Sequence, residues 1–164
     1  MQVPEWGYSV PEEFLDPKTT VKASGRELRI SHKSAREICN AIKGMMLTEA
    51  KSFLKDVIAK RRIVPFKRFN KKAAHHRGLE KAYAGKHPVK AAKEILKVLR
   101  NAENNAENKG LDAERLKIIH ASAYPGMKIK RYMPRAFGRA TPRFETLTHV
   151  EVILEEMPQI PEEA

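Results

Sequence analysis

Three stretches of the chain place apolar residues at the spacing of an amphipathic α-helix. In residues 32–44 the apolar positions follow an i, i+3, i+4, i+7 pattern: Ala35, Ile38, Cys39 and Ile42. Residues 49–61 and 88–109 carry apolar stripes of the same kind. Because this spacing puts apolar side chains on one helical face, the pattern predicts three helices, each with one face in a core.

The ends of these helices carry recognisable signals. Ser31 and Thr48 precede the first two helices, and a hydroxyl at this position can accept a hydrogen bond from a free first-turn N–H. Pro88 opens the third helix, where its missing N–H has no cost. Gly44 and Gly110 follow the first and third helices and predict their ends.

Three other stretches alternate apolar and polar residues, as half-buried strands do. Residues 143–155 show the clearest alternation, and residues 114–125 and 19–30 follow weaker versions of it. Gly25 marks a turn or bulge in the strand of residues 19–30. Strict alternation in residues 114–125 would place Ile119, Ala121 and Ala123 on one face of the strand. Ile118, His120 and Ser122 would then lie on the other face.

The remaining segments lack a core pattern. Residues 1–18, rich in proline and acids, predict an irregular N-terminal arm, and the acidic residues 157–164 predict a disordered tail. Between them, we expect residues 19–156 to form a single domain of helices and strands. Residues 124–143 are too long for a tight turn between two strands, so we expect an extended hairpin arm that projects from this domain.

A basic insertion, residues 62–87, interrupts the helical pattern and contains three aromatic residues, Phe66, Phe69 and Tyr83. A loop of this length in a compact domain is functional or disordered. The sequence leaves two roles open for each ring. The ring either stacks on exposed RNA bases or anchors the loop to the core.

The positive charge is concentrated in two segments. The chain has 32 Lys and Arg against 20 Asp and Glu, a net charge of +12. Residues 60–90 carry +10 and residues 124–143 carry +6 without a single acid, so the rest of the chain is slightly acidic. Charge focused in this way indicates phosphate binding, and the interleaved aromatic residues favour RNA.

Several classes of protein are disfavoured. No apolar run approaches ~18 residues, so we expect no membrane span, and the N-terminus does not resemble a signal peptide. No phosphate-binding glycine motif is present, so we expect no nucleotide cofactor. His75 and His76 point apart in an extended chain and lack ligands at metal spacing. Cys39 falls on an apolar helix face, so we expect a core residue rather than a nucleophile.

Two segments resemble a known family. The arm motif Met133-Pro134-Arg135-Ala136-Phe137-Gly138-Arg139-Ala140, followed by Thr148-His149-Val150, resembles the same stretch of one family. That family is the universal large-subunit ribosomal protein twenty-two family. Its helix-opening basic motif is similar to Ser31-His32-Lys33-Ser34-Ala35-Arg36. The family often has proline where His32 stands and lysine where Ser34 stands. The resemblance covers residues 19–156, and the basic insertion resembles the archaeal and eukaryotic branch.

This resemblance implies a fold and a place of action. The implied fold is α+β, a small three-stranded antiparallel sheet packed on about three helices, with a long protruding β-hairpin arm. The implied function is that of a structural constituent of the large ribosomal subunit, in the cytoplasm, which binds ribosomal RNA and supports assembly. Its hairpin tip would line the peptide exit tunnel and meet the nascent polypeptide, and other large-subunit proteins would be its neighbours.

We therefore expect two sets of site residues, and neither catalytic nor metal-binding residues. The RNA-binding set is His32, Lys33, Arg36, Lys67, Arg68, Lys71, Lys72, His75, His76, Arg77, Lys128, Lys130, Arg131, Arg135, Arg139 and Arg143. The tunnel-lining set is Met133, Pro134, Arg135, Ala136, Phe137, Gly138, Arg139 and Ala140. Met133 and Phe137 either face the tunnel or wedge against a base.

Two alternatives come from other classes. An RNA-modifying or nucleic-acid-processing enzyme would use its basic arms to deliver substrate, but it would need a catalytic cluster that the sequence does not supply. A DNA-architectural protein would bind duplex DNA as well as RNA.

Overall fold

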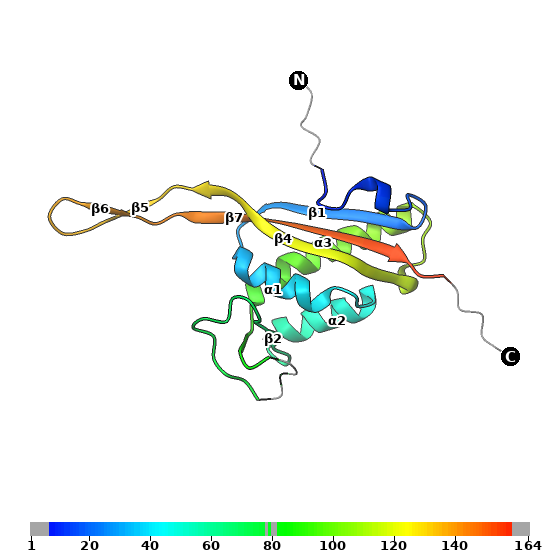
Figure 1. Ribbon diagram of the computed structural model, residues 1–164, viewed down its shortest axis with the longest axis horizontal. Helices are drawn as coiled ribbons and strands as arrows, with labels where there is room; N and C mark the ends of the chain where they lie inside the picture. The colour runs from blue at the N-terminus through cyan, green and yellow to red at the C-terminus, as the bar shows by residue number, and fades with distance from the viewer. Residues whose placement is uncertain (1–6, 78, 80–81, 159–164) are drawn as a thin grey trace, which may run out of the picture.

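The computed structural model describes residues 7–77, 79 and 82–158. A three-stranded antiparallel sheet runs in the order β1 (Thr20–Leu28), β7 (Glu145–Glu156), β4 (Leu116–Ile129). Three helices pack on one face of the sheet, and a thin hairpin extends far beyond it (Figure 1). The expected α+β class, with a three-stranded sheet and three helices, is confirmed.

The helices lie within a few residues of their predicted positions: α1 (His32–Ile42), α2 (Leu47–Ile58) and α3 (Val89–Asn108). Ser31 occupies the N-cap of α1, although its side chain makes no capping bond. The expectation that Thr48 caps α2 is wrong. The cap residue is Met46, and the helix starts earlier because Leu47 is fully buried at its first position.

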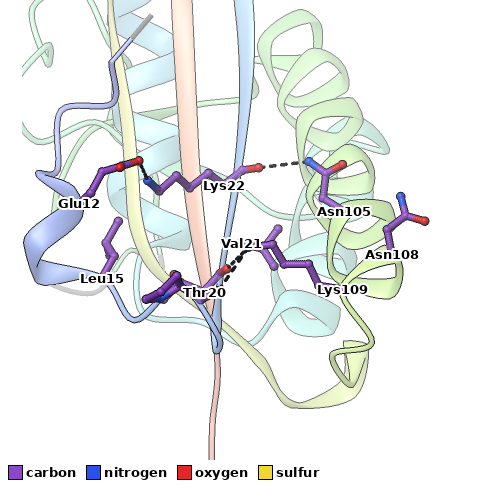
Figure 2. A pocket seen from close by; sticks show the side chains of 9 residues that line it. Glu12, Leu15, Thr20, Val21, Lys22, Asn105, Asn108 and Lys109 are labelled. Atoms are coloured by element: carbon purple, nitrogen blue, oxygen red, sulfur yellow. Dashed lines mark hydrogen bonds and ion pairs between the residues drawn. The ribbon is translucent and has the colours of Figure 1, made fainter. Parts of the chain in front are cut away.

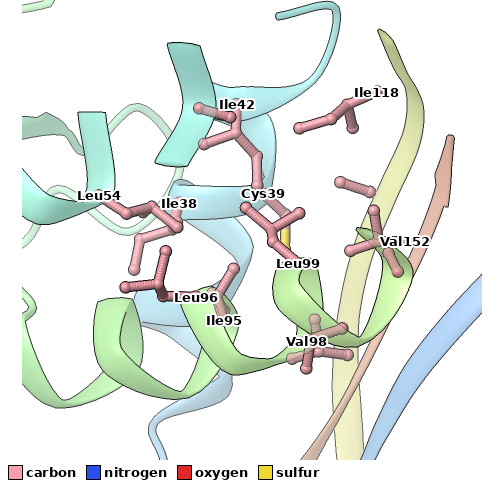
Figure 3. Close-up of a cluster of buried hydrophobic side chains, with 14 of the residues drawn as sticks. Ile38, Cys39, Ile42, Leu54, Ile95, Leu96, Val98, Leu99, Ile118 and Val152 are labelled. Carbon is pink, nitrogen blue, oxygen red and sulfur yellow. The ribbon is translucent and has the colours of Figure 1, made fainter. Parts of the chain in front are cut away.

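The core lies between the helices and the inner face of the sheet. Figure 3 shows Cys39 of α1 beside Leu99 of α3, with Ile38 on one side and Ile118 of β4 and Val152 of β7 on the other. All five side chains are almost completely buried. The apolar helical faces predicted from the sequence therefore meet one another and the sheet in a single core, and Cys39 is part of it.

Strand β7 is buried on both of its faces. Every residue from 147 to 154 is buried, including Glu151 and Ile153, which point away from the helices. The segment before β1, which contains a short 3-10 helix (Glu12–Phe14), lies against this outer face. There the Ser9 N–H and hydroxyl donate to the Glu151 carboxylate, and His120 Nε2 lies 3.1 Å from the same group. The described part of the N-terminal arm thus covers the central strand.

The register of the outer strands shifts at three places, once in β1 and twice in β4, where the second shift lies between Pro125 and Lys128. In β1 the register shifts between Gly25 and Leu28, which confirms the predicted irregularity at Gly25. In β4 it shifts between Ile118 and His120, so Ile118 and Ala121 both face the core. The strict alternation predicted for this strand is wrong, because the extra residue at the bulge changes which side chains point inward.

The hairpin arm continues from β4 and β7. A second, short ladder joins β5 (Tyr132–Pro134) to β6 (Ala140–Pro142), and the chain reverses at residues 135–139. This part lies at the far end of the projection in Figure 1, away from all helices. Among residues 126–142 none is fully buried. The arm therefore folds as a two-stranded ribbon without a core of its own.

The basic insertion leaves α2 and returns to α3 through a two-residue ladder of β2 (Val64–Pro65) with β3 (Gly85–Lys86). Its three rings differ in burial, and two of them anchor the loop to the core. Phe66 is buried in the core, Phe69 is partly buried against it, and Tyr83 is 62% exposed.

A second 3-10 helix (Ala113–Arg115) connects α3 to β4. Most of the acidic tail predicted to be disordered, and the first six residues of the N-terminal arm, lie outside the described residues. No helix among the residues that the structure describes has the length and apolarity needed to cross a bilayer.

The position of Cys39 gives a chemical prediction. Burial raises the pKa of this thiol from 9.0 to about 12, so at pH 8 its thiolate fraction falls about a thousandfold relative to an exposed cysteine. We expect iodoacetamide to leave Cys39 unmodified in the native protein and to alkylate it rapidly once concentrated urea has unfolded the chain. Mass spectrometry measures both rates. Equal rates would show that Cys39 is accessible in the native state.

Candidate nucleic-acid interface

The arm presents its cations to solvent. Six basic side chains lie along it, all exposed: Lys128, Lys130, Arg131, Arg135, Arg139 and Arg143. The ribbon is only two strands wide, so these charges are held close together while no acid lies between residues 124 and 143. Like charges at this density repel one another, and a polyanion that surrounds the arm would remove that repulsion.

The tip of the arm is a tight turn. The Arg135 N–H donates to the Arg139 carbonyl at 2.8 Å, and Phe137 and Gly138 both adopt left-handed backbone angles, with φ of 59° and 67°. The Phe137 side chain is 100% exposed. The predicted tip motif therefore forms a single turn that carries an arginine on each side and one unpacked aromatic ring.

An acid at the root of the arm holds the arm to the body. Glu145 accepts hydrogen bonds from Arg29 Nε at 3.2 Å and from Arg29 Nη2 at 2.9 Å, and Arg131 Nη2 lies 3.9 Å away. The bond from Arg29 lowers the pKa of Glu145, so this carboxylate is ionised at neutral pH.

A second basic surface gathers around one ring of the insertion. The cationic groups of Lys33, Arg36 and Arg68 each lie 5.8 Å from the centroid of the Phe69 ring, and the His32 ring meets it edge-on at 6.4 Å. We call these five residues the Phe69 cluster. The structure thus brings the basic start of α1 together with the start of the insertion, which the sequence placed more than thirty residues apart.

A buried carboxylate holds the Phe69 cluster in place. Glu37 of α1 is 1% exposed and accepts the backbone N–H groups of Lys67, Arg68 and Phe69 at 2.9–3.2 Å. Glu37 was not among the predicted site residues. Helical spacing alone would pair it with Lys33, four residues earlier in the same helix. Its actual partners come from a distant loop, and no local pattern signals them.

The other predicted residues of the insertion lie along its exposed outer part. Lys71 and Lys72 form a turn in which Lys72 has a left-handed φ of 57°. His75 forms a β-bridge with Ala84, and the His76 N–H donates to the Tyr83 carbonyl. Across the described residues there is no group of three or more side chains suited to hold a metal ion.

Arg77 and Lys67 lie near two arginines that were not among the predicted site residues, Arg61 and Arg62. Together with Arg61 and Arg62 they line a hollow of about 630 Å³ beside the ends of α1 and α2. The Arg62 guanidinium lies 4.9 Å from the centroid of the Phe53 ring. Both arginines lie in the basic segment of residues 60–90, so the charge count signalled the region but not these residues.

A further hollow of about 550 Å³ lies between the N-terminal segment and the end of α3 (Figure 2). Several of its polar groups make structural bonds. Asn105 Nδ2 donates to the Lys22 carbonyl at 3.1 Å, Lys109 Nζ donates to the Thr20 carbonyl at 3.0 Å, and Lys22 pairs with Glu12. These bonds tie α3 to the free edge of β1, which protects that edge from pairing with other chains.

Ser9, His120 and Glu151 have the composition of a hydrolase triad but not its geometry. Ser9 Oγ and Glu151 Oε1 both lie 3.1 Å from the same histidine atom, Nε2, and the serine hydroxyl also bonds the glutamate directly. In a triad the acid orients the histidine through its other ring nitrogen. This group therefore fastens the N-terminal segment to the sheet.

Comparison with known proteins decides the family. The family model of ribosomal protein L22p/L17e matches residues 23–155. The chain belongs to this family. The match includes most of the sheet, all three helices, the insertion and the whole arm.

The similar curated proteins include archaeal members of the family, each named large ribosomal subunit protein uL22. That of Archaeoglobus fulgidus is 59% identical over 85% of this chain and 90% of its own length. That of Ignicoccus hospitalis is 51% identical over 94% of this chain and 99% of its own length, and that of Aeropyrum pernix is 47% identical over 94% and 100%. The recognition of the family, with its archaeal type, is confirmed.

Membership settles the class of the protein. It is a ribosomal protein of the large subunit, a structural component rather than an enzyme, and its location is the ribosome in the cytoplasm. The alternatives of an RNA-processing enzyme and a DNA-architectural protein are therefore set aside.

The role of Glu37 gives a prediction about stability. In Glu37→Ala, three backbone N–H groups lose their acceptor, so we expect a loss of about 1–3 kcal/mol in the free energy of unfolding. Urea denaturation measures this loss, and hydrogen exchange should show faster exchange at Lys67, Arg68 and Phe69. Glu103→Ala, which removes the partly exposed partner of Lys51, is the control and should cost less. Unchanged exchange at the three amides would contradict the role of Glu37.

Proposed function

We propose that this protein binds large-subunit ribosomal RNA through two surfaces, the hairpin arm and the basic insertion, and that it supports assembly of the subunit by holding them together. The observation that carries the proposal is the arm itself. It projects from the body with six exposed cations and no acid, and none of the described residues outside it packs around its far end. RNA that encloses the arm supplies both the missing contacts and the opposite charge.

The second surface supports the same proposal. The Phe69 cluster joins α1 to the insertion, and the arginines of the neighbouring hollow extend its positive charge. The insertion lies on the helical side of the body, and the arm leaves from one end of the sheet (Figure 1). One rigid body with two separated cationic surfaces suits contact with two segments of RNA at once.

At the tip, we infer that residues 133–140 line the peptide exit tunnel and meet the nascent chain. The family resemblance is the basis of this inference, and the fully exposed Phe137 supports it. A phenylalanine in a left-handed conformation with no packing partner costs stability in the free protein. A wall contact with RNA or nascent peptide would use the ring.

A sucrose gradient tests the proposal that the protein is held in the subunit by RNA. In native extract, we expect the protein to sediment with the large subunit and to remain there after a high-salt wash, since enclosed contacts are screened less than exposed ones. Replacing Arg131, Arg135, Arg139 and Arg143 by glutamine should reduce incorporation. Replacement of four exposed lysines outside both basic surfaces, Lys18, Lys43, Lys93 and Lys97, is the matched control. A protein stripped from the subunit by modest salt would contradict the proposal.

Photo-crosslinking tests the position of the tip. With benzoylphenylalanine in place of Phe137, stalled translating ribosomes should give crosslinks to the nascent chain that are absent from empty ribosomes. The same replacement at Phe14, an exposed ring on the body, is the control and should give none. Crosslinks from position 137 to RNA alone would contradict a tunnel-facing Phe137 and favour the wedge against a base.

A further inference from the structure

The arm has a break between its two ladders. The long β4–β7 ladder ends at the pair Ile129 and Glu145, and the short β5–β6 ladder begins at Tyr132 and Pro142. Between them a single bond remains, from the Arg143 N–H to the Arg131 carbonyl at 2.6 Å. A hollow of about 630 Å³ opens at this break, and we call it the waist pocket.

Two aromatic side chains line the waist pocket. Tyr132 is 63% exposed and Phe144 is 48% exposed, and their rings meet edge-to-face with centroids 6.0 Å apart. The arm has no core in which these rings could be buried. Their arrangement leaves ring surface open to solvent with a second ring standing at a right angle beside it. A flat, unpaired base can stack on such a surface, and every base has the π-face that stacking needs.

The charges around the waist pocket distinguish a base from a phosphate. Glu145 is ionised and lies in the lining, where it would repel a phosphate but can accept a hydrogen bond from a base N–H group. Arg131 and Arg143 line the same hollow and are exposed, so they can reach the phosphates on either side of the base.

We propose that the waist pocket holds one unstacked base of ribosomal RNA, which stacks on Tyr132 or Phe144 while its flanking phosphates pair with Arg131 and Arg143. This proposal rests on the proposed RNA-binding function and names the ligand at one point of the arm. RNA is favoured over a peptide as occupant because the surrounding residues 124–143 carry six cations and no acid.

The salt dependence of binding provides the test, because stacking is uncharged and phosphate contacts are not. The full-length protein is titrated with large-subunit ribosomal RNA over a series of KCl concentrations. We expect Tyr132→Leu and Phe144→Leu to weaken binding by about 5- to 100-fold, by the same factor at every salt concentration. Arg143→Gln should instead lower the slope of log K against log salt by about one.

Three controls keep the result specific. Phe14→Leu removes an exposed ring outside the arm and should leave binding unchanged. Phe144→Tyr keeps the ring and should restore binding. Circular dichroism and urea midpoints equal to those of the unchanged protein establish that the leucine variants fold.

The outcomes separate this proposal from the proposed function. If the unchanged protein does not bind this RNA, the RNA-binding function itself fails. If the unchanged protein binds this RNA but the two leucine variants bind as tightly as Phe14→Leu, the waist pocket holds no base and the proposal is wrong. The proposal is also wrong if the variants bind RNA normally and lose only a neighbouring ribosomal protein from the assembled subunit.

Discussion

Burial of β7 on both faces is the constraint on which the rest of the structure depends. This strand pairs with β1 on one side and β4 on the other, and its residues 147–154 are all buried. Helices α1 and α3 cover its inner face, and the N-terminal segment covers the outer one through Ser9 and Glu151. A sheet of three strands is small, so covering both faces of its central strand secures enough apolar burial for one stable body. The arm leaves the body from β4 and returns directly into β7, so one of its two legs joins a strand that is buried on both faces.

The fold separates two tasks that conflict in a small basic protein. A core requires apolar side chains, and an RNA interface requires dense positive charge. Here the core uses the helices and the sheet, while the cations are displaced to the insertion and the arm. Each displaced surface is tied back by an acid. Glu37 binds the start of the insertion through three backbone N–H groups, and Glu145 binds Arg29 at the root of the arm. These two carboxylates orient the positive surfaces and neutralise little of their charge.

Periodicity in the sequence was enough to locate the three helices and the three long strands, because each buries one face and the apolar spacing records it. It could not place Ile118 and Ala121 on the same side of β4, since a one-residue bulge leaves no mark in an alternating pattern. It also could not pair Glu37 with the insertion or Ser9 with Glu151, because those contacts join residues that are distant in sequence. The charge count located both basic segments, yet the grouping of His32, Lys33, Arg36 and Arg68 around Phe69 depends on tertiary structure alone.

Several residues hold a side chain at a backbone conformation that favours glycine. Lys60, Lys72 and Phe137 all adopt left-handed angles, with φ between 57° and 61°, where glycine would fit without strain. Lys60 directly follows the end of α2, where a left-handed residue commonly terminates a helix, and a fourth such residue, Glu27 with φ of 51°, lies in the β1 bulge. Lys72 and Phe137 instead lie in exposed turns of the insertion and the arm, where a side chain is kept although glycine would fit. Gly126 is the reverse case, since a Cβ at this position would lie 2.5 Å from Nε2 of His149, and the fold itself requires glycine there. The strain at Phe137, whose side chain is fully exposed, is typical of a residue that acts on a partner, and the proposed function supplies RNA or nascent peptide as that partner.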